Sequence, residues 1–312
     1  TDGWTVVEGK AQAAGLPVSI NARVRQGDEG TELEAESART VWKGLAISLV
    51  EPARIVVRDG VAQIERLVLS PGGGRVSVTG SAGQELAVDL AISGLPLNSV
   101  NAVAPGAGLS GALSGRVKVR GAASAPVIDY ALDASGVRAA AASSVADVPL
   151  AVSATGGFKA NQLSFNANAS GGGLAFTASG SLQTTGSQAI SARINGSVPF
   201  SLLSGAIAKQ GLALSGTAQA NIAIDGSIGA PVISGTIATK GSRLVDGRSG
   251  VAIDNLSADI GLTAGEASIR SLSGDLSSGG RISGSGVVGL DPAANFPADL
   301  KLKVARARYA DG

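Results

Sequence analysis

Residues 115–132 read GRVKVRGAASAPVIDYAL, and this stretch contains the pattern that decides the fold. Val117 and Val119 alternate with three basic residues, so apolar and charged side chains point to opposite sides of an extended chain. Strict alternation of this kind predicts a β-strand with one apolar face. Ala125-Pro-Val-Ile128 then begins a second extended stretch, and the pair predicts an antiparallel hairpin.

The same pattern returns at residues 216–237, which read GTAQANIAIDGSIGAPVISGTI. In both copies Ala-Pro-Val-Ile begins four residues after a Gly that closes an alternating stretch. The two prolines, Pro126 and Pro231, lie 105 residues apart. Proline lacks an N–H, so we expect each to lie at a strand entry or a sheet edge. A repeat of this length predicts a structure that is extended one unit at a time.

Two further signals recur at spacings near 100 residues. Gly-rich turns are predicted at residues 72–74, 171–173 and 279–280. Short helices are predicted at residues 94–100 and 197–209, where Pro occupies a helix-start position, and Gly211 is a plausible C-cap for the second. We therefore predict a partial unit over residues 1–93 and two full units over residues 94–196 and 197–312.

The composition excludes several kinds of chemistry. The 312 residues include no His, Cys or Met, and the net charge is +1. Without His and Cys the chain has no ordinary zinc site, thiol nucleophile or Ser-His-Asp triad. The acidic residues are scattered, which predicts a solvated outer face; examples are Asp89, Asp129, Asp225 and Asp259. We expect no enzymatic activity, no cofactor and no metal, and the balanced charge argues against a nucleic-acid partner.

Three smaller motifs have local interpretations. Residues 284–289 match GxGxxG, but no helix pattern follows, so they predict a strand or turn rather than a nucleotide site. Asn195-Gly196 predicts a turn. The stretch from Lys301 to Arg308 changes phase between its two pairs of basic residues, which predicts a bulge and an outward basic stripe.

The chain begins at Thr1 with neither Met nor an apolar leader, and no stretch reaches 18 apolar residues. We expect it to be a piece of a longer protein whose membrane anchor lies outside this piece.

In their order and spacing, these stretches resemble the TamB family of AsmA-like bridge proteins of Gram-negative envelopes. The resemblance rests on residues 95–97, 115–121 and 125–128, on their echo at residues 198–200, 216–226 and 230–235, and on residues 279–286, 296–300 and 307–309. It covers most of the chain from about residue 45, as a fragment that precedes or overlaps the family's C-terminal domain.

The resemblance implies a long, curled, antiparallel-rich sheet that forms an open apolar groove, a β-taco, with a few short helices. It implies a place in the periplasm, with the parent protein anchored in the inner membrane and the outer-membrane barrel TamA as a partner through a region outside this fragment. The family is linked to phospholipid transport between the two membranes and to outer-membrane protein assembly.

The alternation independently assigns one aliphatic row to each strand. We expect these rows to line a groove for phospholipid acyl chains, because a large uncovered apolar surface marks a binding site. The predicted lining residues are Val76, Val78, Leu86, Val88, Leu90, Ile92, Val117, Val119, Leu174, Phe176, Ile190, Ile194, Ile222, Ile224, Ile282, Leu300 and Leu302.

Three alternatives stay open at this point. The same rows could pack against each other in a closed β core. The chain could be an assembly factor that offers strand edges to barrel or autotransporter clients with TamA. It could be an adhesin with a parallel β-helix, although that fold has a much shorter repeat.

Overall fold

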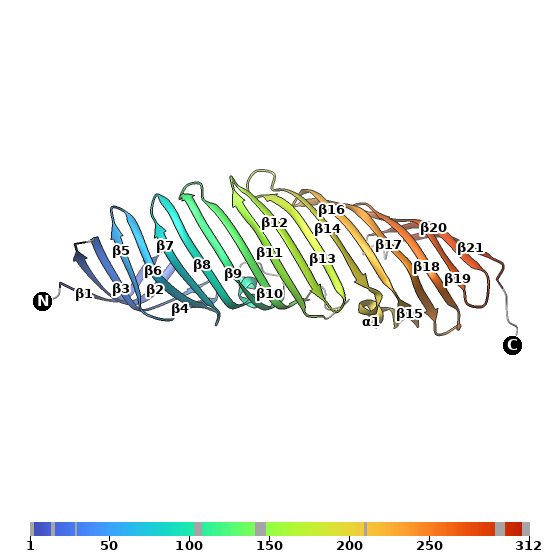
Figure 1. The fold of residues 1–312 in the computed structure, drawn as a ribbon, viewed down its shortest axis with the longest axis horizontal. Helices are drawn as coiled ribbons and strands as arrows, with labels where there is room; N and C mark the ends of the chain where they lie inside the picture. The colour runs from blue at the N-terminus through green and yellow to red at the C-terminus, as the bar shows by residue number, and fades with distance from the viewer. Residues whose placement is uncertain are drawn as a thin grey trace. The chain divides into compact units, whose positions relative to one another are not determined.

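The computed structural model describes residues 3–13, 16–28, 30–102, 108–140, 148–208, 211–290 and 297–307. In this part of the chain 21 strands pair in antiparallel fashion, with a few short helical turns (Figure 1), which confirms the all-β prediction. The curl into a groove stays a prediction. The chain divides into two compact units, each described by itself: unit 1 is Thr1–Ala141 with Pro149–Ser164, and unit 2 is Ala142–Val148 with Phe165–Gly312.

Unit 1 is a meander in which strands that follow each other in sequence pair along most of their length. Its elements are β1 (Thr5–Ala13), β2 (Leu16–Gly27), β3 (Gly30–Trp42), β4 (Leu45–Leu49), β5 (Ala53–Arg58), β6 (Val61–Pro71), β7 (Arg75–Ala82), β8 (Glu85–Pro96), the 3₁₀ turn η1 (Leu97–Ala102), β9 (Leu109–Ala122), β10 (Val127–Ala139), β11 (Leu150–Lys159) and the first residues of β12 (Gln162–Gly171).

One position in this meander is shared by two short strands. The long β3 pairs with β5 through residues 31–35 and with β4 through residues 39–42. β6 likewise pairs with both. Pro52 lies in the break between β4 and β5, where the chain needs no ladder N–H.

Unit 2 is also an antiparallel meander with one strand position split in two. It contains the rest of β12, then β13 (Leu174–Gln183), β14 (Ala189–Pro199), the turn η3 (Phe200–Leu203), α1 (Ser204–Ala208), β15 (Leu212–Ser215), β16 (Thr217–Ser227), β17 (Ala230–Asp246), β18 (Ala252–Leu262), β19 (Glu266–Leu276), β20 (Arg281–Gly289) and β21 (Ala298–Ala305). β15 and β16 pair with the two halves of β17 on either side of Gly216.

The three Gly-rich turns are confirmed, and two of them show why the repeat requires Gly. Gly72 and Gly172 have φ values of +55° and +59°. A Cβ on Gly72 would meet the Ser99 side chain of η1, and one on Gly172 would meet Leu202 of η3. In each unit, therefore, a hairpin turn tucks against a short helical turn that follows almost 30 residues later. The third turn, at residues 279–280, joins β19 to β20.

Short helical turns lie near both predicted places, but each begins after its proline. Pro96 and Pro199 are the last residues of β8 and β14, η1 begins at Leu97 as a 3₁₀ turn, and η3 with α1 extends from Phe200 to Ala208. The Gly211 N–H donates to the Ala208 carbonyl at 2.9 Å, and Gly211 has φ +79°, as a C-cap requires. Lys209 lies outside the described residues.

The two repeated prolines lie near strand entries, as expected. Pro126 directly precedes β10. Pro231 is the second residue of β17, opposite Gly226 of β16, and β18 begins to pair with β17 only at Gly235. Neither proline therefore removes an N–H that a central ladder would use.

Two local predictions were wrong. Asn195 and Gly196 lie inside β14, not in a turn. β21 contains no bulge: it ends at Ala305, and Arg306 follows with φ +56°. Arg308 lies outside the described residues. The GxGxxG stretch lies in β20, as predicted for a strand.

Few large side chains are fully buried in the part of the chain that the structure describes. Seven of its ten buried hydrophobic residues are alanines, and the others are Val68, Leu97 and Leu256. The sheet of each unit is therefore held mainly by its hydrogen-bonded ladders and by side chains that neighbouring strands half cover. The three predicted repeat units do not coincide with the two compact units and remain a description of the sequence repeat.

Candidate functional site

All eight predicted lining residues of unit 1 lie on one face of its sheet, which we call the aliphatic face of unit 1. Directly opposed residues of neighbouring strands share a face. Val76 of β7 opposes Ile92 of β8, and Val78 opposes Leu90. In the next ladder Leu90 opposes Val117 of β9. The same two ladders place Leu86, Val88 and Val119 on this face.

This face is wider than predicted. One row of opposed residues runs unbroken across nine strands: Val24, Leu33, Ile55, Ile64, Gly80, Val88, Val119, Ile128 and Phe158. The prediction missed its members in β2, β3, β5, β6, β10 and β11. The signal was present, because these strands show the same alternation.

Unit 2 has an aliphatic face of its own, and all nine predicted residues of that unit lie on it. Its clearest row of opposed residues is Phe176, Gly196, Ala220, Ile237, Ile260, Ile269, Gly286 and Leu300. Leu174 shares the face of Phe176 two residues along β13. The remaining predicted residues join through the same ladders: Ile190, Ile194, Ile222, Ile224, Ile282 and Leu302.

None of the seventeen predicted residues is fully buried. Fifteen are half-buried. Leu300 and Leu302 on β21 are 49% and 56% exposed, and their neighbour Val304 is 56% exposed. Side chains that pack between two sheets lose nearly all of their accessible surface, as core residues do. These rows keep the partial exposure expected of apolar side chains that are covered only by neighbouring side chains on the same sheet.

Glycines on the aliphatic faces make room for the larger side chains. A Cβ on Gly196 would collide with the Phe176 ring, and one on Gly156 would collide with the Tyr130 hydroxyl group. Tyr130 lies across Gly156, and its hydroxyl donates to the Ser164 carbonyl at 3.0 Å. Burial raises the pKa of the Tyr130 hydroxyl group above its ordinary value. The glycines therefore allow large side chains on the aliphatic faces to lie flat across the neighbouring strand.

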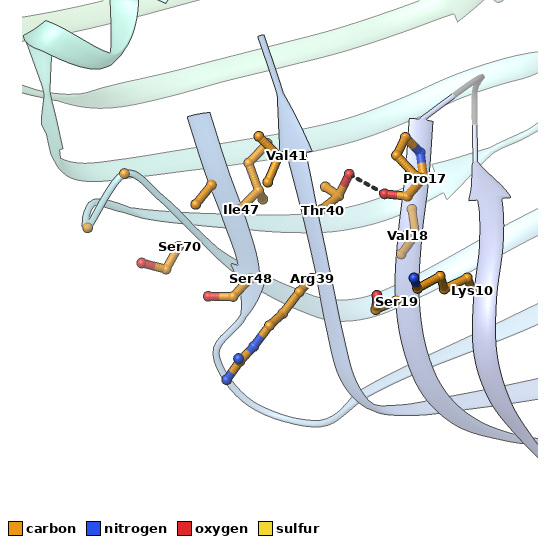
Figure 2. A pocket seen from close by; sticks show the side chains of 13 residues that line it. Lys10, Pro17, Val18, Ser19, Arg39, Thr40, Val41, Ile47, Ser48 and Ser70 are labelled. Carbon is orange, nitrogen blue, oxygen red and sulfur yellow. Dashed lines mark hydrogen bonds between the residues drawn. The ribbon is translucent and has the colours of Figure 1, made fainter. Parts of the chain in front are cut away.

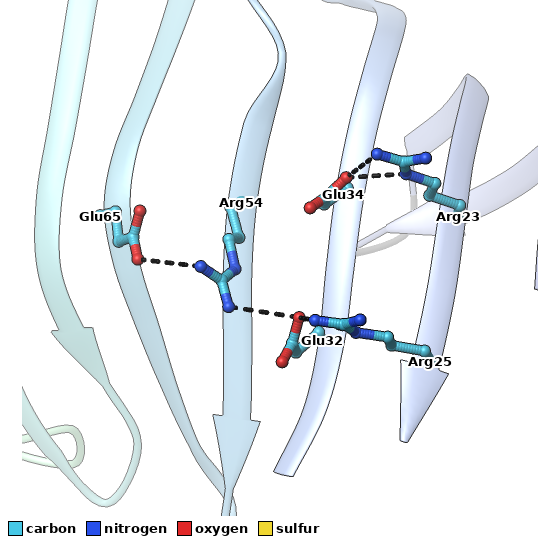
Figure 3. Close-up of polar contacts among 6 residues, drawn as sticks. All are labelled: Arg23, Arg25, Glu32, Glu34, Arg54 and Glu65. Carbon is cyan, nitrogen blue, oxygen red and sulfur yellow. Dashed lines mark hydrogen bonds and ion pairs between the residues drawn. The ribbon is translucent and has the colours of Figure 1, made fainter. Parts of the chain in front are cut away.

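The opposite face of unit 1, which we call its charged face, carries paired ions (Figure 3). Glu32 of β3 is only 4% exposed and lies between Arg25 of β2 and Arg54 of β5. Arg25 donates from Nε and Nη2 to Glu32 Oε2 at 3.0 and 2.8 Å. Arg54 Nη2 lies 3.2 Å from the same oxygen, and its Nη1 is 3.7 Å from Glu65 Oε1.

These contacts shift the acidity of Glu32. The hydrogen bond from Arg25 holds the pKa of the Glu32 carboxyl below its ordinary value, and Arg54 acts in the same direction. Arg23 pairs with Glu34 in the adjacent row, and the Trp4 ring lies 4.8 Å from the Arg23 guanidinium carbon and 4.6 Å from that of Arg25. The network joins β2, β3, β5 and β6 across the side of the sheet that faces away from the aliphatic rows.

The scattered acidic residues behave as a solvated outer face. Asp89 pairs with Arg120 at 2.8 Å, Asp225 with Arg193 at 3.5 Å and Asp259 with Arg270 at 3.5 Å, and about half of each acidic side chain is exposed. In unit 2, Asp275 accepts hydrogen bonds from Asn255 and Arg281, which lower its pKa in that order of size. Each of these pairs joins side chains of two neighbouring strands.

Within the described ranges, no three His, Cys, Asp or Glu residues lie close enough to hold a metal ion, and no helix is long and apolar enough to cross a membrane. The chain matches no family model, and comparisons with curated proteins and with solved structures found no similar protein. The resemblance to the TamB family therefore rests on the quoted residues alone.

Proposed function

We propose that this chain is a non-enzymatic segment of a periplasm-spanning conduit that carries phospholipids between the inner and outer membranes. Acyl chains would lie on the aliphatic faces. The observation that carries this proposal is the row from Val24 to Phe158, in which eight apolar residues and Gly80 oppose one another across nine strands without an intervening charge.

The energetics favour an acyl chain as the occupant. Each buried methylene contributes about 0.8 kcal/mol, so a chain of roughly 16 carbons has a large gross driving force. Neighbouring strands repeat about every 4.8 Å. Successive positions along the row are chemically alike, so a bound chain can move from strand to strand with little change in free energy. Transport needs such even binding, whereas a deep pocket would trap the ligand.

The cellular setting is part of the proposal and comes from the family resemblance. It comprises the periplasm of a Gram-negative bacterium, an inner-membrane anchor and the barrel protein TamA, the last two reached through regions outside this chain. The absence of His and Cys fits a conduit that performs no chemistry on its cargo.

Two matched variants test whether the aliphatic face of unit 1 binds acyl chains. Val119 belongs to the aliphatic face, and Val127 opposes Arg120 on the charged face one strand away. We expect Val119→Asp to abolish binding of the neutral probe N-phenyl-1-naphthylamine, and Val127→Asp to leave it unchanged. Circular dichroism checks that both variants fold. Equal loss in the two variants would contradict the proposal, and unfolding of Val119→Asp alone would favour a closed core.

A second candidate function has one observation in its favour. Residues 230–234 of β17 are exposed and pair with β16 alone, and within the described residues β21 pairs with β20 alone. Free strand edges can accept an added strand from another protein. They support an assembly factor for outer-membrane β-barrel or autotransporter proteins acting with TamA. Binding of an unfolded barrel protein, unaffected by Val119→Asp, would favour this alternative.

A further inference from the structure

A pocket of about 710 Å³ opens in unit 1 beside the ends of β1, β2, β3, β4 and β6 (Figure 2). We call it the basic pocket. Lys10, Ser19 and Arg39 are among the residues that line it. It contains two cations and several hydroxyl groups but no carboxylate.

One row of directly opposed residues crosses this pocket on the charged face. The order is Lys10, Ser19, Arg39, Ser48 and Ser70, on five neighbouring strands. At about 4.8 Å per strand, the Cα atoms of Lys10 and Arg39 are roughly 10 Å apart, with Ser19 between them. An anion placed over Ser19 is therefore within reach of both long basic side chains and of a hydroxyl donor.

The cations of this row differ from their neighbours on the same face. Arg23, Arg25 and Arg54 each pair with a glutamate. Among the described residues, neither Lys10 nor Arg39 has an ion-pair partner, and Glu8, two residues along β1 from Lys10, forms no ion pair with it. The pocket thus contains two positive charges that no carboxylate of the described residues pairs with, and a bound anion would supply the negative charge.

A second row gives the pocket an apolar side. This row consists of Pro17, Val41 and Ala46. Each lies two residues along its strand from Ser19, Arg39 or Ser48 respectively and therefore shares that residue's face. All three are exposed, and Val41 is 57% exposed. Thr40 alternates to the other face of β3, and its hydroxyl group already donates to the Pro17 carbonyl at 2.8 Å. An inorganic anion would cover the charged row and leave the apolar row in water.

We propose that the basic pocket binds the phosphate group of an anionic phospholipid. The phosphate lies between Lys10 and Arg39 over Ser19. The apolar part of the lipid next to the phosphate covers Pro17, Val41 and Ala46. Arg39 and the serine hydroxyls give the geometry for several phosphate oxygens, whereas Lys10 acts as a point charge. The row from Lys10 to Ser70 and the row of Pro17, Val41 and Ala46 both lie on the face opposite the aliphatic rows, so this site does not depend on the proposed acyl-chain function.

Calorimetric titration tests the proposal with dihexanoyl-phosphatidylglycerol below its micellar concentration and with inorganic phosphate. The variants are Lys10→Gln/Arg39→Gln and, as a matched control, Arg116→Gln/Lys118→Gln, which removes two cations elsewhere on the same face. We expect the first pair to weaken lipid binding at least about tenfold, since each charge-assisted hydrogen bond contributes more than a neutral one. The control should bind within about twofold of the unaltered protein.

Three results would overturn the proposal: unchanged lipid binding in Lys10→Gln/Arg39→Gln, equal loss in the control, or inorganic phosphate binding as tightly as the lipid. Titration of the neutral probe N-phenyl-1-naphthylamine separates this site from the proposed function. The probe should bind the Lys10→Gln/Arg39→Gln protein normally. If the probe binds to none of the proteins while lipid binding is retained, acyl-chain binding on the aliphatic faces is contradicted, and the proposal for the basic pocket is unaffected.

Discussion

The two copies of Ala-Pro-Val-Ile have the same sequence and begin equivalent strands, but they differ in their surroundings. Ile128 in the first copy and Ile233 in the second both lie on the aliphatic face of their unit, opposite Val119 and Ile224. Ile128 is half-buried, because β11 runs past it and places Phe158 directly opposite. Ile233 is 42% exposed, and Val232 beside it is 53% exposed.

The difference comes from the length of the next strand. β18 ends at Leu262, opposite Gly235, so the first five residues of β17 extend beyond it. The repeated motif therefore determines where a strand begins and which way its side chains point. A neighbouring strand, encoded elsewhere in the sequence, determines whether those side chains are covered.

The largest expected effect is on the covered copy. Gly156 lies opposite Tyr130, and a Cβ there would collide with the Ser164 carbonyl and the Tyr130 hydroxyl. Gly229 directly precedes the second copy, and a Cβ there would meet nothing within 4 Å. We expect Gly156→Val to lower the free energy of unfolding by about 3 kcal/mol and Gly229→Val to change it by less than about 0.5 kcal/mol. Urea denaturation measures both, and equal effects would contradict the comparison.

A smaller difference is expected for the isoleucines themselves. Ile128→Ala removes half-buried methylenes and should lower the free energy of unfolding by about 1.5 kcal/mol. Ile233→Ala removes side-chain atoms that are already largely in water, so its cost should stay below about 0.5 kcal/mol. The same denaturation experiment compares them. A larger loss for Ile233→Ala would mean that the tip of β17 is covered in solution.

Hydrogen exchange sharpens the comparison without a substitution. Strand β10 has ladder partners on both sides at Ile128, whereas Val232 to Ser234 have partners, among the residues that the structure describes, only in β16. We expect the amides of the second copy that face away from β16 to exchange at least about tenfold faster than any amide of residues 128–130. Equal protection of the two copies would show that another strand covers the edge of β17.

The smallest effect concerns pH and compares the two units. Glu32 in unit 1 and Asp275 in unit 2 both have lowered pKa values, caused first by the Arg25 and Asn255 hydrogen bonds respectively. A carboxyl group whose pKa is lower in the folded protein than in the unfolded protein stabilises the fold at pH values above its pKa in the unfolded state. This contribution is lost as the pH falls through the pKa of the group in the folded state. Stability should stay level from pH 7 to about 5 and fall below about pH 4.

Variants assign the acid sensitivity to each unit. Glu32→Gln should flatten the fall for unit 1 alone, and Asp275→Asn should flatten it for unit 2 alone, as followed by exchange of amides in each unit across the pH series. An unchanged acid profile in both variants would show that other carboxylates dominate.

Most of the face assignment could be read from the sequence, because alternation is a local property. All seventeen predicted residues share a face within their own unit, the three Gly-rich turns lie where they were predicted, and a short helical turn directly follows both Pro96 and Pro199. The ion pairs on the charged face were missed, although Glu32 and Glu34 alternate on β3 as Arg23 and Arg25 do on β2. Which strands become neighbours in register is a property of the fold, so this pairing needed the structure.

Asn195-Gly196 shows where local reasoning fails. The dipeptide is typical of a tight turn, yet it lies inside β14, where Gly196 makes room for the Phe176 ring of β13. The requirement for Gly comes from a residue twenty positions away. The exposure of Val232 and Ile233 has the same kind of cause, since it depends on where β18 ends.

The most direct test of the central claim is native mass spectrometry, with lipid extraction, of the chain purified from bacterial envelopes. If the chain is a phospholipid conduit, phospholipid should co-purify with the unaltered protein and with Val127→Asp, and should be lost from Val119→Asp. A folded, monodisperse and lipid-free unaltered protein would contradict the conduit function, and the strand-edge assembly function would then be the better explanation of this chain.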